Sequence, residues 1–446
     1  MNLLIEKSKF GFSYLVQIRF ELFIFLCSFL IRLIWILNTD SYPTLDGYAY
    51  YSNAYSLAND GKVDFYWPVG YSAFLALFMK LGISKLFYFK LLNVIVSSLS
   101  VVIGYKIVLH YIHNRAKRIL AVFLLVFYPE FIFFNSLFWS ETLFIFLLLL
   151  SFYLLILNKI KLTSVALAIS IFVKPISILI PVVYSIIFLP PNKRRHFLVN
   201  SYAIILLFHL PWMVFNYQQT GKLGLVSNNG PTNLFIGNNQ YATGHYDEEG
   251  LKNISKFPTD DLKKNVFQFW TTYYQDIPLL VSKKISYLLF GMPSPWIWSV
   301  GIGTNVYSQL PRYLTIEEYQ LIKTKINDVS FLVNCYQLND KIKLYSLETS
   351  ADDYTKATMA NTLVYTGVVT YNKESQFLFL SEIAFFLNVF LILVFLIKLV
   401  YFGIRRIPLF VVPIYFLVFY SFFFGDFRFF LPAIPFLIIG NFLPKK

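Results

Sequence analysis

Charged side chains at the edges of apolar segments are the residues of this chain best suited to chemistry. Asp46 follows the first long apolar segment, with aromatic and turn residues around it at 42–48 and again at 66–71. Charged groups are costly at membrane depth, so each one indicates a function. The others at such edges are Glu130, Glu141, Lys174, Asp426 and Arg428. Carboxylates that accept a proton, beside cations that hold a phosphate, could carry out a group transfer.

Composition places these residues in a membrane protein. Of 446 residues, 57% are apolar, 20% are aromatic and only 14% are charged, which is typical of a chain that lies largely in lipid. We therefore expect an all-α polytopic membrane protein with about ten transmembrane helices, several of them short. No cleavable signal peptide is expected, because no small-residue cleavage pattern ends the first apolar stretch. The apolar stretches are 20–38, 86–109, 119–136, 142–158, 162–173, 175–190, 197–215, 377–401, 407–423 and 429–443.

The formal net charge of +14 predicts a membrane topology, and its placement argues against a nucleic-acid ligand. If both termini are cytoplasmic, all the basic clusters fall on the cytoplasmic side of a ten-span chain, as the positive-inside rule requires. These clusters are Lys7, Lys9 and Arg19; Arg115, Lys117 and Arg118; Lys159 and Lys161; Lys193, Arg194 and Arg195; Arg405 and Arg406; and Lys445 and Lys446.

The same topology divides the chain into three parts. Residues 1–215 are expected to form a transmembrane catalytic core that includes an outer loop at 39–85, and residues 377–446 form the last transmembrane helices. Between them, residues 216–376 should form an extracytoplasmic domain of mixed helical and irregular structure that acts as a lid. The segment 277–290 is amphipathic and is expected to lie on the bilayer. Whether 287–300 crosses the membrane is left open.

Cysteine and histidine give little support for a cofactor. Cys27 lies in the first apolar stretch and Cys335 in a distant polar stretch, so neither a disulfide between them nor a cysteine metal site is expected. His110 and His113 have a helical spacing but no third ligand nearby. No cofactor is required, although two carboxylates on the outer face could bind a divalent cation.

Several short motifs follow one another along the chain in a recognisable order. They are Asp46-Gly47-Tyr48, Trp67-Pro68-Val69-Gly70-Tyr71, Tyr128-Pro129, Ser140-Glu141-Thr142, Lys174-Pro175, Pro211-Trp212, Asn216-Tyr217, the segment 227–239, and Arg428-Phe429-Phe430-Leu431-Pro432. In order and spacing they resemble the C-type membrane glycosyltransferases, the clan of the protein mannosyltransferases and aminoarabinose transferases.

The resemblance implies a sugar donor carried on a polyprenyl phosphate, such as undecaprenyl phosphate, and a site on the extracytoplasmic face of the plasma or inner membrane. It also implies a role in glycan biosynthesis at the cell envelope. Protein mannosyltransferases usually have a glutamate after the first-loop aspartate, where this chain has Gly47. Glycan, lipid and protein therefore all stay open as acceptors.

These residues can be given roles in sugar transfer. Asp46 is the expected general base, and direct displacement would invert the anomeric centre. Glu141 would hold the acceptor or orient a cation, while Lys174 and Arg428 would stabilise the phosphate as it gains charge. The remaining candidates for substrate binding are Tyr48, Trp67, Tyr71, Asn228, Asn229, Asn233 and Asn238.

Each role has a structural alternative. Asp46 could cap a helix, the aromatic residues could form an interfacial belt, and the asparagines could belong to a turn-rich loop. Two other functions also fit: a polymerase or ligase of lipid-linked glycans, and a transporter of them. Transporters tend to carry broken helices at the membrane midplane, whereas the charges here are expected at one face.

Overall fold

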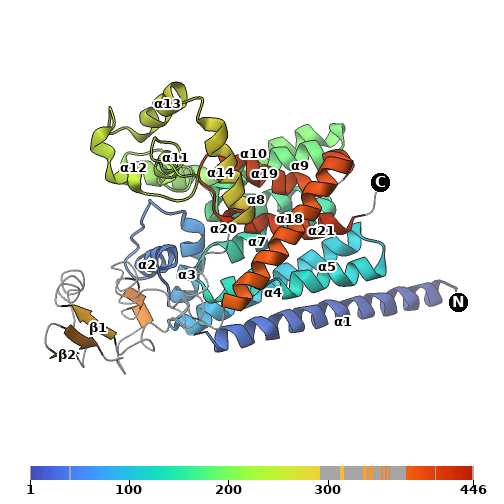
Figure 1. The fold of residues 1–446 in the computed structure, drawn as a ribbon. Coiled ribbons are helices and arrows are strands. Elements are labelled where there is room, and N and C mark those ends of the chain that lie inside the picture. Colours follow the sequence, from blue (N-terminus) through green and yellow to red (C-terminus); the bar gives the residue numbers. More distant parts are fainter. Residues whose placement is uncertain are drawn as a thin grey trace.

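The computed structural model describes residues 2–39, 42–291, 312–315, 335–338, 341–344, 353–354, 357–358, 361, 378–406 and 408–443. Within them the chain is mostly helical (Figure 1). Both termini lie at one end of the helical bundle, and α2 (Asp46–Asn59) and α3 (Val69–Lys80) lie towards the other end.

Among the residues that the structure describes, four helices are long and apolar enough to cross a membrane. These spans are 17–37 within α1 (Asn2–Leu37), α4 (Leu86–Tyr111), α10 (Pro191–Thr220), and 380–403 within α18 (Leu378–Arg406). A fifth is possible if α5 (Arg115–Phe127) and the segment 129–136, bent by 41°, count as one span. The helices thus indicate a membrane protein, as the sequence predicted.

The count of ten spans is not confirmed. Every predicted apolar stretch coincides with helix in the structure, but the remaining helices are short, and prolines interrupt several of them. Proline lacks the amide donor that a helix interior needs, so it begins a new helix or turn. The short segments are α6 (Pro129–Phe133), η1 (Phe134–Ser136), α7 (Glu141–Ile156), α8 (Ile160–Val173), η2 (Pro175–Leu179), α9 (Ile180–Phe188), η4 (Pro408–Phe410), α19 (Val411–Ser421), α20 (Phe427–Phe430), η5 (Leu431–Ala433) and α21 (Ile434–Phe442).

Helix α7 lies inside the bundle. Its sequence is apolar on all sides after the first turn, and Phe144, Leu148 and Phe152 are completely buried. A helix that is apolar all round is stable only when other helices or lipid surround it. This buried position allows the short α7 to hold Glu141, its first residue, at a fixed place.

Polar side chains tie the first helix to its neighbours inside the bundle. Arg32 of α1 is fully buried; its Nε donates to Ser97 Oγ of α4 at 2.8 Å, and its Nη1 donates to Ser28 Oγ at 2.7 Å and to the Val126 carbonyl of α5 at 3.1 Å. Buried polar groups are costly unless they are hydrogen-bonded. These bonds therefore fix α1 against α4 and α5.

A second polar tie connects α6 with α18. Glu130 is 1% exposed, and its Oε1 accepts a hydrogen bond from Asn388 Nδ2 at 2.6 Å. The Tyr128 hydroxyl donates to the same amide group. Glu130 thus lies inside the helix packing and not at an open site, which fits a structural role.

The described part of 216–376 contains helices and three strands. The helical elements are α11 (Gly230–Ile236), α12 (Glu249–Lys252), η3 (Ile254–Lys256), α13 (Leu262–Thr272) and α14 (Ile277–Phe290). Strands β1 (Arg312–Thr315), β2 (Cys335–Leu338) and β3 (Lys341–Leu344) form an antiparallel sheet in the order β1-β3-β2, with Arg312 opposite Leu344.

The all-α fold class predicted from the sequence holds for the described helices, and these three short strands were not predicted. Lys341–Leu344 alternates charged and aliphatic residues, the period-two pattern of a half-buried strand. Four such residues are too few to stand out in a sequence. The question of a crossing at 287–300 falls mainly on residues that the structure does not describe, because only 287–290, in α14, and Gly291 are described.

Candidate active site

Asp46 begins α2 at a constrained turn. The preceding Leu45 has φ 52°, a value that residues other than glycine rarely adopt. Its backbone N–H donates to Asn361 Oδ1 at 2.7 Å. Strained backbone of this kind persists only where surrounding contacts hold it, often at functional sites. The turn directs the Asp46 carboxylate, which is 28% exposed, towards the C-terminal part of the chain.

Arg428 is the partner of Asp46. Arg428 Nη1 lies 2.6 Å from Asp46 Oδ2, and the guanidinium lies over the rings of Trp139 at 4.7 Å and Phe429 at 4.9 Å. Aromatic faces attract cations, more strongly where water is excluded. Arg428 Nε is buried and finds no hydrogen-bond acceptor in the described part of the chain. This buried atom faces the Asp426 carboxylate as an ion pair that is too long for a hydrogen bond.

The short helix α20 holds Arg428 in place. Asp426 is its N-cap, and the carboxylate Oδ1 accepts from the Arg428 backbone N–H at 2.9 Å. Asp426 Oδ2 lies 3.8 Å from Arg428 Nε. Phe429 stacks on Tyr420 with the rings 4.7 Å apart and 7° from parallel. The Asp426 cap and the stacked Phe429 ring together fix the orientation of α20 and thus the direction of the Arg428 side chain.

Lys174 and Glu141 form a second ion pair. Lys174 Nζ lies 2.8 Å from Glu141 Oε1, and their side chains are 12% and 4% exposed. Lys174 is extended because Pro175 follows it, and Glu141 begins α7, where the helix dipole favours a negative charge. Lys174 Nζ also lies 5.5 Å from the Phe429 ring centre.

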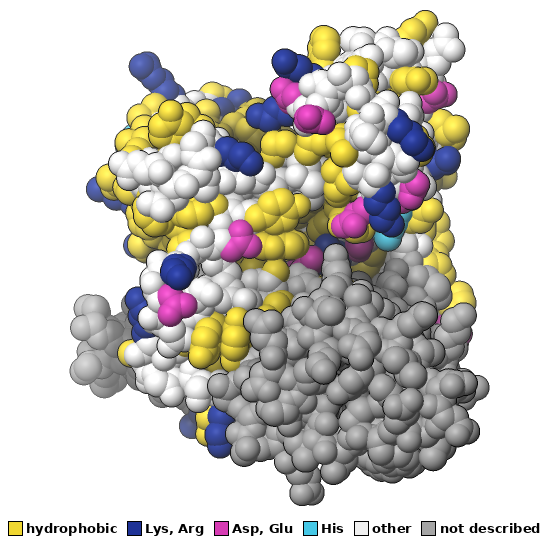
Figure 2. All heavy atoms as spheres, turned by 90° about the vertical axis from the view of Figure 1, so that its left-hand side faces the viewer, with side chains coloured by type: hydrophobic (Ala, Val, Ile, Leu, Met, Phe, Trp, Pro, Cys, Tyr) yellow, Lys and Arg dark blue, Asp and Glu magenta, His cyan; other side chains and the backbone are white. Residues whose placement is uncertain are grey.

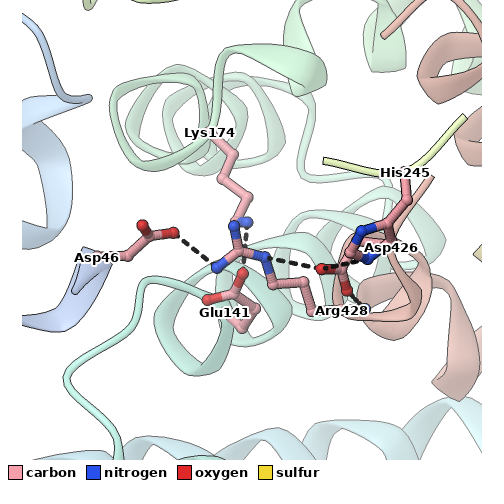
Figure 3. Close-up of polar contacts among 6 residues, drawn as sticks. All are labelled: Asp46, Glu141, Lys174, His245, Asp426 and Arg428. Carbon is pink, nitrogen blue, oxygen red and sulfur yellow. Dashed lines mark hydrogen bonds and ion pairs between the residues drawn. The ribbon is translucent and has the colours of Figure 1, made fainter. Parts of the chain in front are cut away.

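The structure thus brings together the four charged residues predicted for one site. They come from four places in the chain: α2, the start of α7, the end of α8 and α20. The aromatic ring of Phe429 contacts both cations, and Figure 3 shows the two pairs side by side. In Figure 2, acidic side chains, a histidine and basic side chains gather around a recess on this face.

The predicted aromatic residues lie around α2, but not all of them are open to a ligand. The Tyr48 hydroxyl is 3.0 Å from Thr358 Oγ1, and Trp67 packs against Tyr50 with ring centres 5.8 Å apart. Tyr71 is completely buried, and its hydroxyl bonds to the Asn93 side chain. Its position does not support direct contact with a substrate.

Tyr50 is a site residue that the sequence analysis missed. Burial raises the pKa of its hydroxyl, a hydrogen bond with Ser140 lowers it, and the nearby charges of Asp46 and Glu141 raise it further. Tyr50 is therefore near enough to both carboxylates of the site for their charges to act on its hydroxyl. Nothing in its local sequence distinguishes it from the other tyrosines of α2.

The asparagines of the segment 227–239 mostly bond within the protein. Asn228 and Asn216 form a pair through their amides at 3.0 and 3.2 Å, and Asn229 Oδ1 accepts from Ser227 Oγ at 2.9 Å. Asn233 is partly exposed on α11. These contacts favour the alternative in which the segment is a turn-rich loop. Sugar binding by these amides stays a prediction.

Asn238 joins three helices. Its Oδ1 accepts from Trp270 Nε1 at 3.1 Å and from Lys284 Nζ at 3.0 Å, while its Nδ2 donates to the Phe422 carbonyl at 2.7 Å. At the neighbouring Gly237, a Cβ would meet the Phe423 carbonyl at 1.8 Å, so only glycine allows this approach. Asn238 therefore holds α11 to α14 and to the end of α19.

Neither a described metal-ligand cluster nor a matching protein helps to define the site. Among the residues that the structure describes, no group of three or more His, Cys, Asp or Glu side chains could hold a metal ion. Comparisons with protein-family models, curated proteins and solved structures found no match. The class of this protein therefore has to be argued from the helices and the site alone.

Proposed function

We propose that this protein is a membrane glycosyltransferase that moves a sugar from a polyprenyl-phosphate donor to an acceptor hydroxyl. The observation that carries the proposal is the pair of ion pairs, Asp46 with Arg428 and Glu141 with Lys174, whose cations share the ring of Phe429. Two cations beside two carboxylates suit a reaction that releases a phosphate and removes a proton. The order of the sequence motifs supports the same class.

In this mechanism the acceptor oxygen attacks the anomeric carbon and the carbon–oxygen bond to the phosphate breaks. Asp46 takes the proton of the acceptor hydroxyl. The prenyl phosphate leaves with one additional negative charge, and Lys174 and Arg428 stabilise that charge more strongly as it develops. Attack from the side opposite to the leaving group inverts the anomeric centre.

Asp46 has to share Arg428 with the donor phosphate for this role. Asp46 Oδ2 is held by Arg428 Nη1 at 2.6 Å, so this contact has to loosen before that oxygen can take a proton. A guanidinium has five N–H donors and can bind two oxygens at once, so Arg428 can contact the phosphate while it still contacts Asp46. When the phosphate binds the guanidinium, the contact between Arg428 and Asp46 weakens and the carboxylate is released to take the proton.

The proposal includes ten spans and a site on the extracytoplasmic face of the cell membrane. Its support is that the four site residues lie at ends of expected spans that the basic clusters assign to the outer side. The short helix α7 is buried against the long α4 and the short α8, so its neighbours in the bundle, rather than lipid, cover it.

A transfer assay tests the proposal. Membranes containing the full chain, or membranes of cells lacking it, would receive a panel of isotope-labelled undecaprenyl phosphates, each carrying a single sugar. We expect that one donor releases undecaprenyl phosphate and that its label enters a product only when the chain is present. Release from lipid-linked oligosaccharides alone would instead indicate the polymerase or ligase. Movement of label across the bilayer without bond cleavage would indicate a transporter.

A further inference from the structure

Beyond the two ion pairs, a histidine lies within reach of the site. His245, in the loop after α11, has its Nε2 3.9 Å from Asp426 Oδ2, and its side chain is 47% exposed. His245 is not among the site residues predicted from the sequence. Figure 3 shows it on the side of Asp426 that faces away from Asp46.

The backbone holds this loop against the turn before α20. The Gly425 N–H donates to the Gly244 carbonyl at 2.8 Å, and a Cβ at Gly425 would lie 2.1 Å from the Lys284 carbonyl. The loop and the turn therefore meet without intervening side chains. His245 and Asp426, each next to one of these glycines, are kept as neighbours.

Asp426 Oδ2 lies between two potential cations. It is 3.8 Å from Arg428 Nε and 3.9 Å from His245 Nε2, so it makes a short hydrogen bond to neither. When His245 is neutral, the full charge of Asp426 acts on Arg428. When His245 is protonated, the two cations share that charge.

We propose that Asp426 and His245 are positioning residues that control how available Arg428 is to the donor phosphate. This inference rests on the proposed function, because it takes Arg428 as a phosphate ligand. Protonated His245 attracts the Asp426 carboxylate, so the ion pair between Asp426 and Arg428 weakens. The protonated ring also adds a positive charge to the site. Both effects strengthen the binding of an anion.

The groups around His245 define the controls. Tyr287 of α14 lies 5.2 Å from it between ring centres, Lys283 lies beside Gly244, and Tyr246, Asp247 and Glu248 follow it in the chain. Lys284 also lies near the turn, and burial lowers its pKa to about 7. Because histidine changes charge between about pH 5 and 8, Lys284 has to be tested separately.

The experiment measures binding and does not need turnover. The full chain, in phosphatidylcholine nanodiscs, would be titrated with radiolabelled farnesyl methyl phosphate between pH 5.5 and 8.5, with empty nanodiscs as background. This probe is a phosphodiester whose single charge does not change in that range. We expect the Kd of the unmodified chain for the probe to fall about threefold to tenfold from pH 8.5 to pH 5.5. One positive charge added near the phosphate, but not in contact with it, implies an effect of this size.

Three variants separate the roles. His245→Gln should bind at every pH as weakly as the unmodified chain does at pH 8.5. Asp426→Asn keeps the cap of α20, because an amide oxygen also accepts the Arg428 N–H, and it should bind tightly at every pH. Lys284→Met should keep the pH dependence, and so should the control His196→Gln, which changes an exposed histidine on α10.

The outcomes distinguish this inference from the proposed function. Binding without pH dependence, pH dependence that survives in His245→Gln, or weak binding by Asp426→Asn would each overturn the positioning roles and leave the glycosyltransferase proposal standing. If the unmodified chain does not bind the probe at any pH, the phosphate site is wrong and the inference fails with it.

Discussion

At the scale of single residues, the contact between Asp46 and Arg428 links the expected base to the expected phosphate ligand. The two side chains come from opposite ends of the chain and meet at 2.6 Å. Neither would be held in this direction without the strained turn at Leu45 and the cap at Asp426. The chemistry of the site therefore depends on these neighbours as much as on the charged groups.

Asp46→Asn should leave the protein folded and reduce transfer by about 10²-fold to 10⁴-fold, because the amide keeps the shape of the side chain and cannot take a proton. The initial rate of label transfer measures the effect. Asp60→Asn, at the exposed end of the same helix, is the matched control and should act normally. Transfer by Asp46→Asn at a near-normal rate would remove Asp46 as the base.

Phe429→Leu should raise the donor KM by roughly twofold to 30-fold, since the ring contacts both cations and each contact contributes about 0.5–2 kcal/mol. Steady-state rates at varied donor concentration give the value. Phe422→Leu, at a ring that is 53% exposed, should leave KM unchanged. An unaltered KM in Phe429→Leu would mean that the ring does not orient the cations.

The four charged residues could be predicted because each one ends or interrupts an apolar stretch. Such a position can be recognised from the sequence alone. Which of these residues form ion pairs with each other could not be predicted. Which cation meets which carboxylate depends on the packing of segments hundreds of residues apart, and the same packing buries Tyr71 and occupies the amide of Asn238. A short run of asparagines looks the same whether it binds a sugar or a carbonyl.

At the scale of helices, Lys284 is the main polar contact between α14 and the end of α19. It is 1% exposed, and its Nζ donates to Asn238 Oδ1 and to the Ser421 carbonyl, which are neutral acceptors. Burial lowers the pKa of Lys284 to about 7. The folded state therefore keeps this amine neutral at a pH where the unfolded chain would protonate it.

The stability that Lys284 contributes to the fold should rise with pH. Between about pH 7 and pH 10.5 the unfolded chain binds the proton and the folded chain does not, so stability from this group rises with pH. We expect the Tm of the unmodified chain minus that of Lys284→Met to increase from pH 7 to pH 9. Thermal unfolding of the two proteins in one detergent measures it. A difference that stays constant or falls would show that Lys284 is protonated in the fold.

Helices were easier to predict than their boundaries. Apolar stretches gave the position of every expected helix, because burial in lipid or protein requires them. The breaks at Pro129 and Pro175 shorten several segments below the length of a full span, and hydropathy averaged over a window does not detect such breaks.

At the scale of the whole molecule, the proposed topology puts the termini and the site on opposite sides of the membrane, in agreement with their places at different ends of the bundle (Figure 1). The loop between α4 and α5 should be cytoplasmic, and the segment that contains α12 and η3 should be outside.

Cysteine labelling tests this arrangement in intact cells. On a background in which Cys27 and Cys335 are serine, Ser255→Cys, at an exposed position, should react with a membrane-impermeant maleimide. His113→Cys, which is exposed after α4, should react only after permeabilisation. The reverse pattern would refute the topology, and reaction of both in intact cells would mean that the spans between them are miscounted.

The buried Arg32 also has a consequence for the order in which the chain enters the membrane. Apart from Ser28 in its own helix, the groups that bond it are Ser97 of α4 and Val126 of α5, which a ribosome makes much later. Arg32 lies near the end of the span 17–37, where an arginine opposes the insertion of a lone helix by less than the roughly 2.5–3.5 kcal/mol that it costs at the centre. Helix α1 therefore reaches its final depth only when α4 and α5 arrive beside it, so early biogenesis proceeds as the joint assembly of three helices.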